Sequence, residues 1–150
     1  MPVGELCNRE VIVVRRDASV VEAASLMREY HVGDLVVVAD DDERRRPVGI
    51  LTDRDIVVEL VAGKLSYDTV TVGDLMSNDL LTAAEGDDLF DTLRRMRDRG
   101  VRRVPVVDKG GALLGILVVD DLLDLLAEQL DTIVSLIGRE VRQERARRGG

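Results

Sequence analysis

Apolar and polar positions follow the same order twice along the chain. In each copy the pattern predicts a strand, an amphipathic helix, two further strands and a second helix. The predicted strands are short apolar runs without an interior charge, which is typical of strands covered on both faces. They are residues 11–14, 35–39 and 49–51 in the first copy, and residues 80–83, 104–108 and 115–117 in the second.

The first helix of each copy has a recognisable start. Ser19 is followed three residues later by Glu22, and Asp88 by another acid. A short side-chain acceptor in this spacing is typical of a helix N-terminus. The second of these helices is predicted to end at Gly100, because glycine commonly follows the last turn of a helix. Apolar residues at helical spacing predict the buried faces: Val20, Ala23, Ala24, Met27 and Tyr30 in the first helix, and Leu89, Phe90, Leu93 and Met96 in the second.

Two motifs occur once in each copy. Val-Gly-Glu-Leu at residues 3–6 returns as Val-Gly-Asp-Leu at 72–75, and Gly-Ile-Leu at 49–51 returns at 115–117. The second motif predicts a strand, begun by its glycine, that turns directly into a helix. The N–H groups of the helix's first turn and a carboxylate would then point into the same small space, which suits a sugar-phosphate. Neither copy can bury both faces of its sheet alone, so we expect an α/β fold of two tandem β-α-β-β-α repeats packed with pseudo-twofold symmetry.

The two copies are expected to end in different helices. The first copy closes with a helix from about Arg54 to Ala62, and the second with a long helix from about Asp121 towards Arg147. We expect domain boundaries at 1–66 and 67–138, followed by a basic tail at 139–150 that is frayed after a break or bend at Gly138. Apolar residues of the long helix form a seam for another helix, which predicts a homodimer: Leu123, Leu126, Leu130, Ile133, Ile137 and Val141.

Composition limits the possible functions. The formal net charge of −8 argues against general nucleic-acid binding, and an aromatic content of 2% leaves little on which bases could stack. Cys7, the single cysteine, is expected to be a buried apolar thiol in a reducing compartment. No signal peptide is visible, and the longest uncharged apolar run is about half the length of a membrane helix. A cytoplasmic protein without a membrane partner is therefore expected.

Few side chains are suited to catalysis. With one His and one Cys, no nucleophile–base pair or metal centre can be assembled, so an enzyme is not expected. His31 is interpreted as a surface or capping residue at a helix end. The acid-then-base run at 40–46 is interpreted as a solvated hairpin loop, because nothing fixes its carboxylates in a metal geometry.

Taken together, these motifs resemble the tandem CBS-domain pair, also called the Bateman module, from Val3 to about Leu126. The Val-Gly-(Glu/Asp)-Leu opening, the apolar strand before an acidic loop and the Gly-Ile-Leu turn occur in both copies. The runs at 49–55 and 100–108 match the family pattern well. The resemblance implies two CBS repeats whose clefts bind adenosine-containing ligands such as AMP, ATP or S-adenosylmethionine.

The resemblance also implies roles for five residues. Asp55 and Asp121 would accept hydrogen bonds from ribose hydroxyls, Thr52 would donate to phosphate, and Arg102 and Arg103 would be the phosphate cations. A carboxylate and a guanidinium suit these tasks chemically. The alternative for each is structural: the threonine and the aspartates cap helices, and the arginines form a solvated pair.

The two implied pockets are not equivalent. Val118 stands where the first copy has Thr52, which removes a hydroxyl donor. Asp34 stands in the place of one of the two arginines and is expected to repel phosphate in the pocket around Asp121. We therefore expect one dominant adenine-nucleotide site, around Asp55.

These features predict a stand-alone regulatory protein. It would sense an AMP- or ATP-like ligand in the cleft between the repeats, without a covalently bound cofactor, and modulate a partner protein that the sequence does not identify. The alternative is a dimeric scaffold or interaction module whose nucleotide clefts are vestigial. Contact of the basic tail with RNA or DNA is disfavoured by the overall negative charge.

Overall fold

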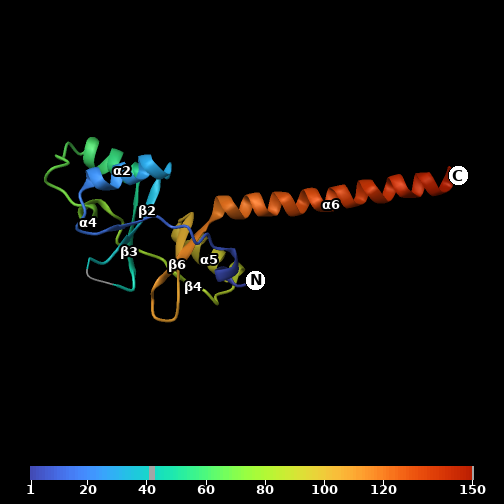
Figure 1. Ribbon diagram of the computed structural model, residues 1–150, viewed down its shortest axis with the longest axis horizontal. Helices are drawn as coiled ribbons and strands as arrows, with labels where there is room; N and C mark the ends of the chain where they lie inside the picture. The colour runs from blue at the N-terminus through green and yellow to red at the C-terminus, as the bar shows by residue number, and fades with distance from the viewer. Residues whose placement is uncertain (41–42, 150) are drawn as a thin grey trace. The chain divides into compact units, whose positions relative to one another are not determined.

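The computed structural model describes residues 1–40 and 43–149 and has a mixed α/β fold with two three-stranded sheets (Figure 1). Two compact units, Met1–Leu117 and Val118–Gly150, are described separately below. The elements are α1 (Val3–Leu6), β1 (Val13–Arg15), α2 (Val20–Tyr30), β2 (Asp34–Val38), β3 (Pro47–Thr52), α3 (Asp53–Asp55), the π-helix η1 (Ile56–Val61), α4 (Val72–Leu75), β4 (Ala83–Ala84), α5 (Leu89–Arg99), β5 (Arg103–Val107), β6 (Leu113–Val118) and α6 (Val119–Arg148). The predicted fold class of two tandem repeats and a long C-terminal helix is confirmed.

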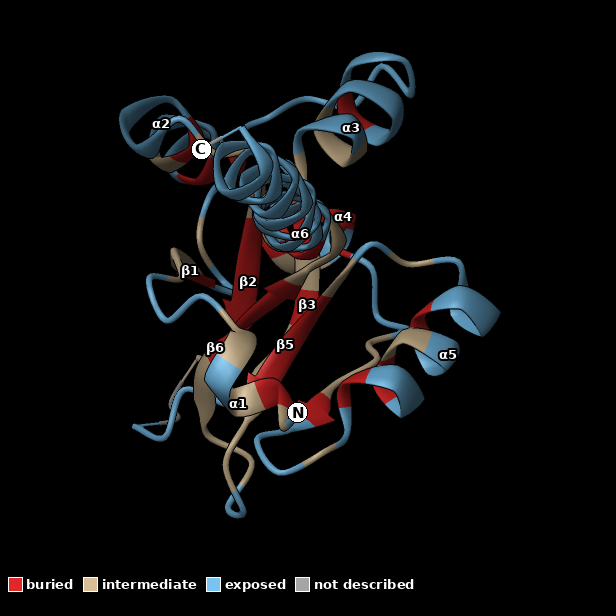
Figure 2. Ribbon diagram, turned by 90° about the vertical axis from the view of Figure 1, so that its right-hand side faces the viewer, coloured by how far each residue is buried: buried red, intermediate tan, exposed pale blue. Residues whose placement is uncertain are grey.

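The two sheets have the same strand order. In the first sheet β2 lies between β1, which is parallel to it, and β3, which is antiparallel to it. In the second sheet β5 lies between β4, which is parallel, and β6. Figure 2 shows buried residues along the central strands β2 and β5. This burial explains why the central strands are almost entirely apolar after their first residue, with the sequences Leu-Val-Val-Val in β2 and Val-Pro-Val-Val in β5.

The predicted helix starts and ends are confirmed. Ser19 Oγ accepts a hydrogen bond from the backbone N–H of Glu22 at 3.1 Å, and Asp88 caps α5 in the same way. His31 and Gly100 end α2 and α5 in the left-handed conformation, with φ of 53° and 67°. His31 is thus a capping residue, as expected.

The buried faces of α2 and α5 are narrower than the sequence suggested. Ala24, Tyr30 and Phe90 are exposed, so their assignment to the buried faces was wrong. Tyr30 is the last residue of α2, and Phe90 points about a quarter-turn away from Leu89. Thr92 is buried on α5 instead, with its hydroxyl donating to the Asp88 carbonyl at 2.9 Å.

Other element boundaries also differ from the prediction. β1 and β4 start at Val13 and Ala83, two and three residues later than expected. The helix expected from Arg54 begins at Asp53 and changes after one turn into the π-helix η1. Residues 41 and 42 of the loop predicted at 40–46 lie outside the described residues.

The opening segment of each copy packs on the sheet of the other copy. The Val3 N–H donates to the Asp87 carbonyl beside β4 at 2.9 Å, and the Val72 N–H donates to the Ala18 carbonyl before α2 at 2.9 Å. Further along, Asn8 and Ile116 exchange backbone hydrogen bonds of 2.9 and 2.8 Å. Val72 and Leu75 of the second opening segment, and Met76 directly after it, belong to the hydrophobic core of the first sheet.

A glycine stands where each opening segment crosses a strand. A Cβ on Gly49 would lie 2.7 Å from the Ser77 carbonyl oxygen, and a Cβ on Gly115 would lie 2.6 Å from the Asn8 carbonyl oxygen. A Cβ atom essentially never comes so near a backbone oxygen, so each crossing requires a residue without a side chain. The Gly-Ile-Leu motif is therefore needed for packing between the two copies.

The same geometry corrects two expectations. Gly49 and Gly115 do not begin their strands, because β3 starts at Pro47 and β6 at Leu113. Cys7, expected to be buried, is half-buried beside the second crossing, with its Sγ 3.6 Å from the Gly4 carbonyl oxygen.

The C-terminal unit consists almost entirely of α6, a single helix of 30 residues. The helix continues through Gly138 and ends at Arg148, so the expected break and the frayed tail were wrong. The backbone groups at the end of α6 form helical hydrogen bonds without needing a core. Within residues 1–40 and 43–149, no helix is both long and apolar enough to cross a membrane.

We predict that Gly115→Ala lowers the free energy of unfolding by about 1–3 kcal/mol, because the added methyl group overpacks the crossing. Gly86→Ala is the matched control, since nothing lies within 4 Å of a Cβ at Gly86. Urea denaturation of the two variants measures the difference. Equal changes would contradict a steric requirement at the crossing.

Candidate functional site

A cavity of about 250 Å³ lies in the Met1–Leu117 unit, where the end of β3 faces the approach to β5. Four of the five residues singled out by the sequence line it: Thr52, Asp55, Arg102 and Arg103. Its remaining lining comes from β3, from the segment after α4 and from the residue before the arginines: Ile50, Ser77, Asp79, Leu80, Leu81 and Val101. Each copy therefore forms one wall of the cavity.

Thr52 and Asp55 hold each other in a capping box at the start of α3. Thr52 Oγ1 accepts from the Asp55 N–H at 3.1 Å, and Asp55 Oδ2 accepts from the Thr52 N–H at 2.9 Å. The structural alternative considered for this pair is thus correct. It does not exclude ligand binding, because both side chains also line the cavity.

Both side chains keep hydrogen-bonding capacity after capping. The Thr52 hydroxyl is used as an acceptor, so its own hydrogen can be donated. Asp55 Oδ1 accepts no hydrogen bond from any described residue, since only Oδ2 takes part in the box. The capping box orients the two groups, and the cavity receives one donor and one charged acceptor.

The opposite wall carries positive charge. Arg102 is exposed and Arg103 half-buried at the start of β5. The Arg103 Nε is fully buried and forms no hydrogen bond with the described residues. Its one ion pair there is with Asp34 Oδ1 at 3.5 Å, which is long for a hydrogen bond. A buried N–H without an acceptor is costly, so an anion in this cavity would be stabilised.

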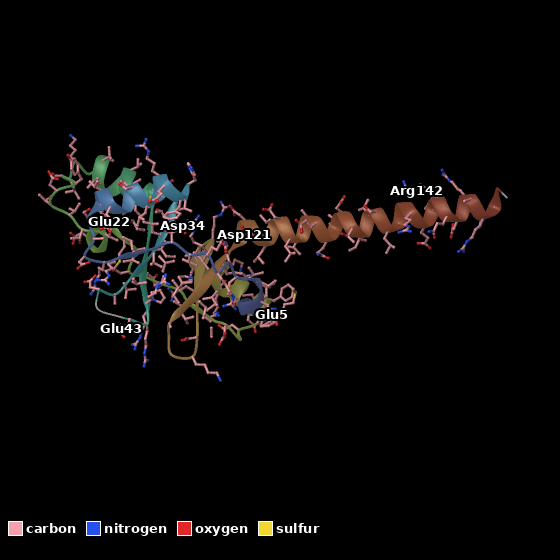
Figure 3. All side chains as sticks on the ribbon, viewed as in Figure 1. Glu5, Glu22, Asp34, Glu43, Asp121 and Arg142 are labelled. Atoms are coloured by element: carbon pink, nitrogen blue, oxygen red, sulfur yellow. The ribbon has the colours of Figure 1, made fainter. Side chains whose placement is uncertain are left out.

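Asp34, labelled in Figure 3, neighbours this cavity. It lies directly opposite Thr52 in the register of β2 and β3. This differs from the expectation that Asp34 belongs to the pocket around Asp121, because strand pairing places it beside Thr52 and its carboxylate forms an ion pair with Arg103. Burial raises the pKa of Asp34, the Arg103 guanidinium lowers it, and the Asp53 carboxylate raises it, with a net increase above 3.8.

Asp121 is exposed in the first turn of α6 (Figure 3). The N-cap residue of α6 is Val118, whose side chain makes no capping hydrogen bond, in contrast to Thr52 at the start of α3. The sequence showed that Val118 lacks the hydroxyl of Thr52. The structure shows that the start of α6 therefore also lacks the capping box present at the start of α3. A ribose contact for Asp121 remains a prediction.

The sequence did not identify the residues that follow α4 as part of the site. Leu80 was assigned to a strand, but β4 begins only at Ala83, and Leu80 lines the cavity instead. Ser77 reaches it because its N–H donates to the Ile50 carbonyl at 3.0 Å, where the second opening segment crosses β3. The repeat showed that this segment corresponds to residues 8–12. It did not show that each of these segments packs on the sheet of the other copy, which is what brings Ser77 and Leu80 to the cavity.

The sequence model of the CBS domain matches residues 3–62 and 72–128. The chain therefore belongs to the CBS domain family, with two tandem repeats. This agrees with the resemblance inferred from the motifs.

Named relatives cover most of the chain. An uncharacterized protein of Methanopyrus kandleri is 37% identical over 123 residues, which are 82% of this chain and 61% of that protein. Hypoxic response protein 1 of Mycobacterium tuberculosis is 34% identical over 124 residues, or 83% of this chain and 84% of that protein. The chain thus spans less than two thirds of the first relative.

Solved structures agree with the fold. The CBS domain pair of protein MJ0100, in complex with 5′-methylthioadenosine and S-adenosyl-L-methionine, has a TM-score of 0.72 and 26% identity over 86% of this chain and 98% of that one. Hypoxic Response Protein I with two coordinated zinc ions has a TM-score of 0.72 and 32% identity, covering 83% and 98%. In the part of our chain that is described, no three His, Cys, Asp or Glu side chains are grouped to hold a metal.

The raised pKa of Asp34 predicts a pH-dependent stability. The folded protein keeps this proton at pH values where the unfolded chain, with a pKa near 3.8, has lost it. The contribution of Asp34 to the free energy of unfolding therefore falls as pH rises from 3.8 through the raised pKa. We expect Asp34→Asn to remove this decrease, so that its stability relative to the parent improves with rising pH in urea titrations. A difference that is constant or of opposite sign would contradict the assignment.

Proposed function

We propose that this chain is a regulatory CBS pair that binds an adenosine-containing ligand in the cavity between its two copies. The observation that supports this most strongly is the shared wall: Thr52 and Asp55 come from the first copy, and Arg102 and Arg103 from the second. Ligand binding would thereby link the two copies, which is the physical basis for a regulatory effect.

Each part of an adenine nucleotide has a matching group. The Asp55 carboxylate is suited to the ribose hydroxyls, and the Thr52 hydroxyl and the arginines to phosphate. Four apolar side chains offer a surface for the base: Ile50, Leu80, Leu81 and Val101. The structure complexed with methylthioadenosine and S-adenosylmethionine supports the adenosine part of this proposal.

The arginines favour a phosphate-bearing ligand, and the size of the cavity favours a small one. About 250 Å³ lies just below the usual range for ligand pockets, roughly 300–1,000 Å³. We therefore propose AMP in preference to ATP. The protein would act in the cytoplasm as a homodimer that modulates a partner protein, without catalysing a reaction.

A thermal-shift panel of AMP, ATP, S-adenosylmethionine and GMP tests the proposal. A ligand at a hundred times its Kd adds about 2.7 kcal/mol of stability, which is readily detected. AMP is expected to give the largest shift. The absence of any shift at millimolar concentrations would favour the alternative function, a scaffold with vestigial clefts.

We predict that Asp55→Ala lowers AMP affinity about tenfold to a hundredfold, because a charge-assisted hydrogen bond is lost. Asp121→Ala is expected to have little effect in the same calorimetric titrations. Asp74→Ala is the matched control, since Asp74 forms an equivalent capping box with Thr71 but does not line the cavity. Equal losses from Asp55→Ala and either other variant would contradict the proposed site.

A second prediction separates phosphate from base recognition. Arg103→Met keeps the apolar stem and removes the charge. We expect it to lower affinity for AMP about tenfold to a hundredfold and to leave affinity for adenosine nearly unchanged. Calorimetry with both ligands measures the difference. A similar loss for both would show that Arg103 supports the fold of the cavity and does not bind phosphate.

A further inference from the structure

The α6 helix presents an apolar face that the described residues 1–40 and 43–149 leave exposed. The six seam residues predicted from the sequence, Leu123, Leu126, Leu130, Ile133, Ile137 and Val141, are between 43% and 63% exposed. They recur at steps of three or four along a helix about 45 Å long, which places them on one side. Such a stripe is typical of a protein interface.

Charge divides α6 into a long acidic part and a short basic end. Residues 119–138 carry five acidic residues and no Lys or Arg, whereas residues 139–148 carry five Arg against two Glu. Asp121 and Arg142 mark these two parts in Figure 3. A second α6 in the parallel direction would place the acidic start of one helix beside the acidic start of the other, and basic end beside basic end. The antiparallel direction places the acidic start of each helix beside the basic end of the other, and it also opposes the two helix dipoles favourably.

The seam is self-complementary in the antiparallel direction. If two α6 helices are centred near residue 132, Leu123 faces Val141 of the second copy and Leu126 faces Ile137 of the second copy. Leu130 and Ile133 then fill the middle of the interface. The spacing of the apolar residues is nearly the same read from either end, so each layer of the pair contains apolar side chains from both chains.

We propose that two copies of this chain associate through antiparallel pairing of their α6 helices. The apolar seam forms the centre of the interface, and the opposite charges of the acidic start and the basic end of α6 set its direction. This specifies the contact behind the proposed homodimer and does not depend on ligand binding in the cavity.

Disulfide cross-linking tests the direction. In a Cys7→Ser background, chains carrying Leu123→Cys and Val141→Cys are purified separately with tags of different mass, mixed and oxidised. Antiparallel pairing predicts the mixed disulfide between the two kinds of chain. Disulfides within each kind would show parallel pairing and overturn the proposal, as would the absence of any cross-link.

Sedimentation of the full chain tests the seam. Ile133→Asp is expected to weaken association about a hundredfold or more, because it buries a charge in the centre of the interface. Ser135→Asp adds the same charge about 160° round the helix from Ile133 and is expected to leave the dimer intact. AMP titration on both variants reports on the cavity separately, so a failed nucleotide site and a failed interface are distinguishable. A monomeric parent chain, or equal effects of both variants, would overturn the proposal.

Charge reversal provides the last test. Arg142→Glu with Arg145→Glu is expected to weaken an antiparallel pair about fivefold or more, since acidic residues would then meet acidic residues. Adding Asp120→Lys and Asp124→Lys to the same chain is expected to restore association. No weakening, or no restoration, would contradict direction-setting by charge.

Discussion

The structure depends on the crossing of each opening segment over a strand of the other copy. Gly49 and Gly115 permit these crossings because a Cβ would meet a backbone oxygen at 2.7 and 2.6 Å. Each copy alone has only three strands and lacks part of its core, which the other copy supplies through residues such as Val72 and Leu75. The two copies are therefore interdependent, and a change at one crossing affects both sheets.

The same crossing builds the candidate site. Because the Ser77 N–H bonds to Ile50, the segment after α4 runs along the end of β3 and contributes Leu80 and Leu81 to the cavity. The Thr52–Asp55 capping box then fixes one wall, and the arginines at the start of β5 form the other. Asp34 offsets part of the positive charge that Arg103 brings to this wall. A ligand that contacts both walls would stabilise the contact between the copies, which is how a small molecule could alter the surface offered to a partner.

The sequence predicted much of this arrangement because its signals were local. Helix caps at Ser19 and Asp88 and the buried strands depend on neighbouring residues, and a repeated motif indicated two equivalent units. The exchange of opening segments is a long-range feature that periodicity does not encode, so Ser77 and Leu80 were missed. The pairing of Asp34 with Arg103 was missed for the same reason. The continuity of α6 through Gly138 shows a further limit, since one glycine lowers helix propensity by only about 1 kcal/mol and neighbouring residues outweigh it.

The most direct measurement of the central claim is a crystal structure of the full chain soaked with AMP. Our account predicts a nucleotide in the cavity with its ribose hydroxyls on Asp55 and its phosphate between Thr52 and the two arginines. An empty cavity at a saturating AMP concentration, or a nucleotide bound only elsewhere, would contradict it.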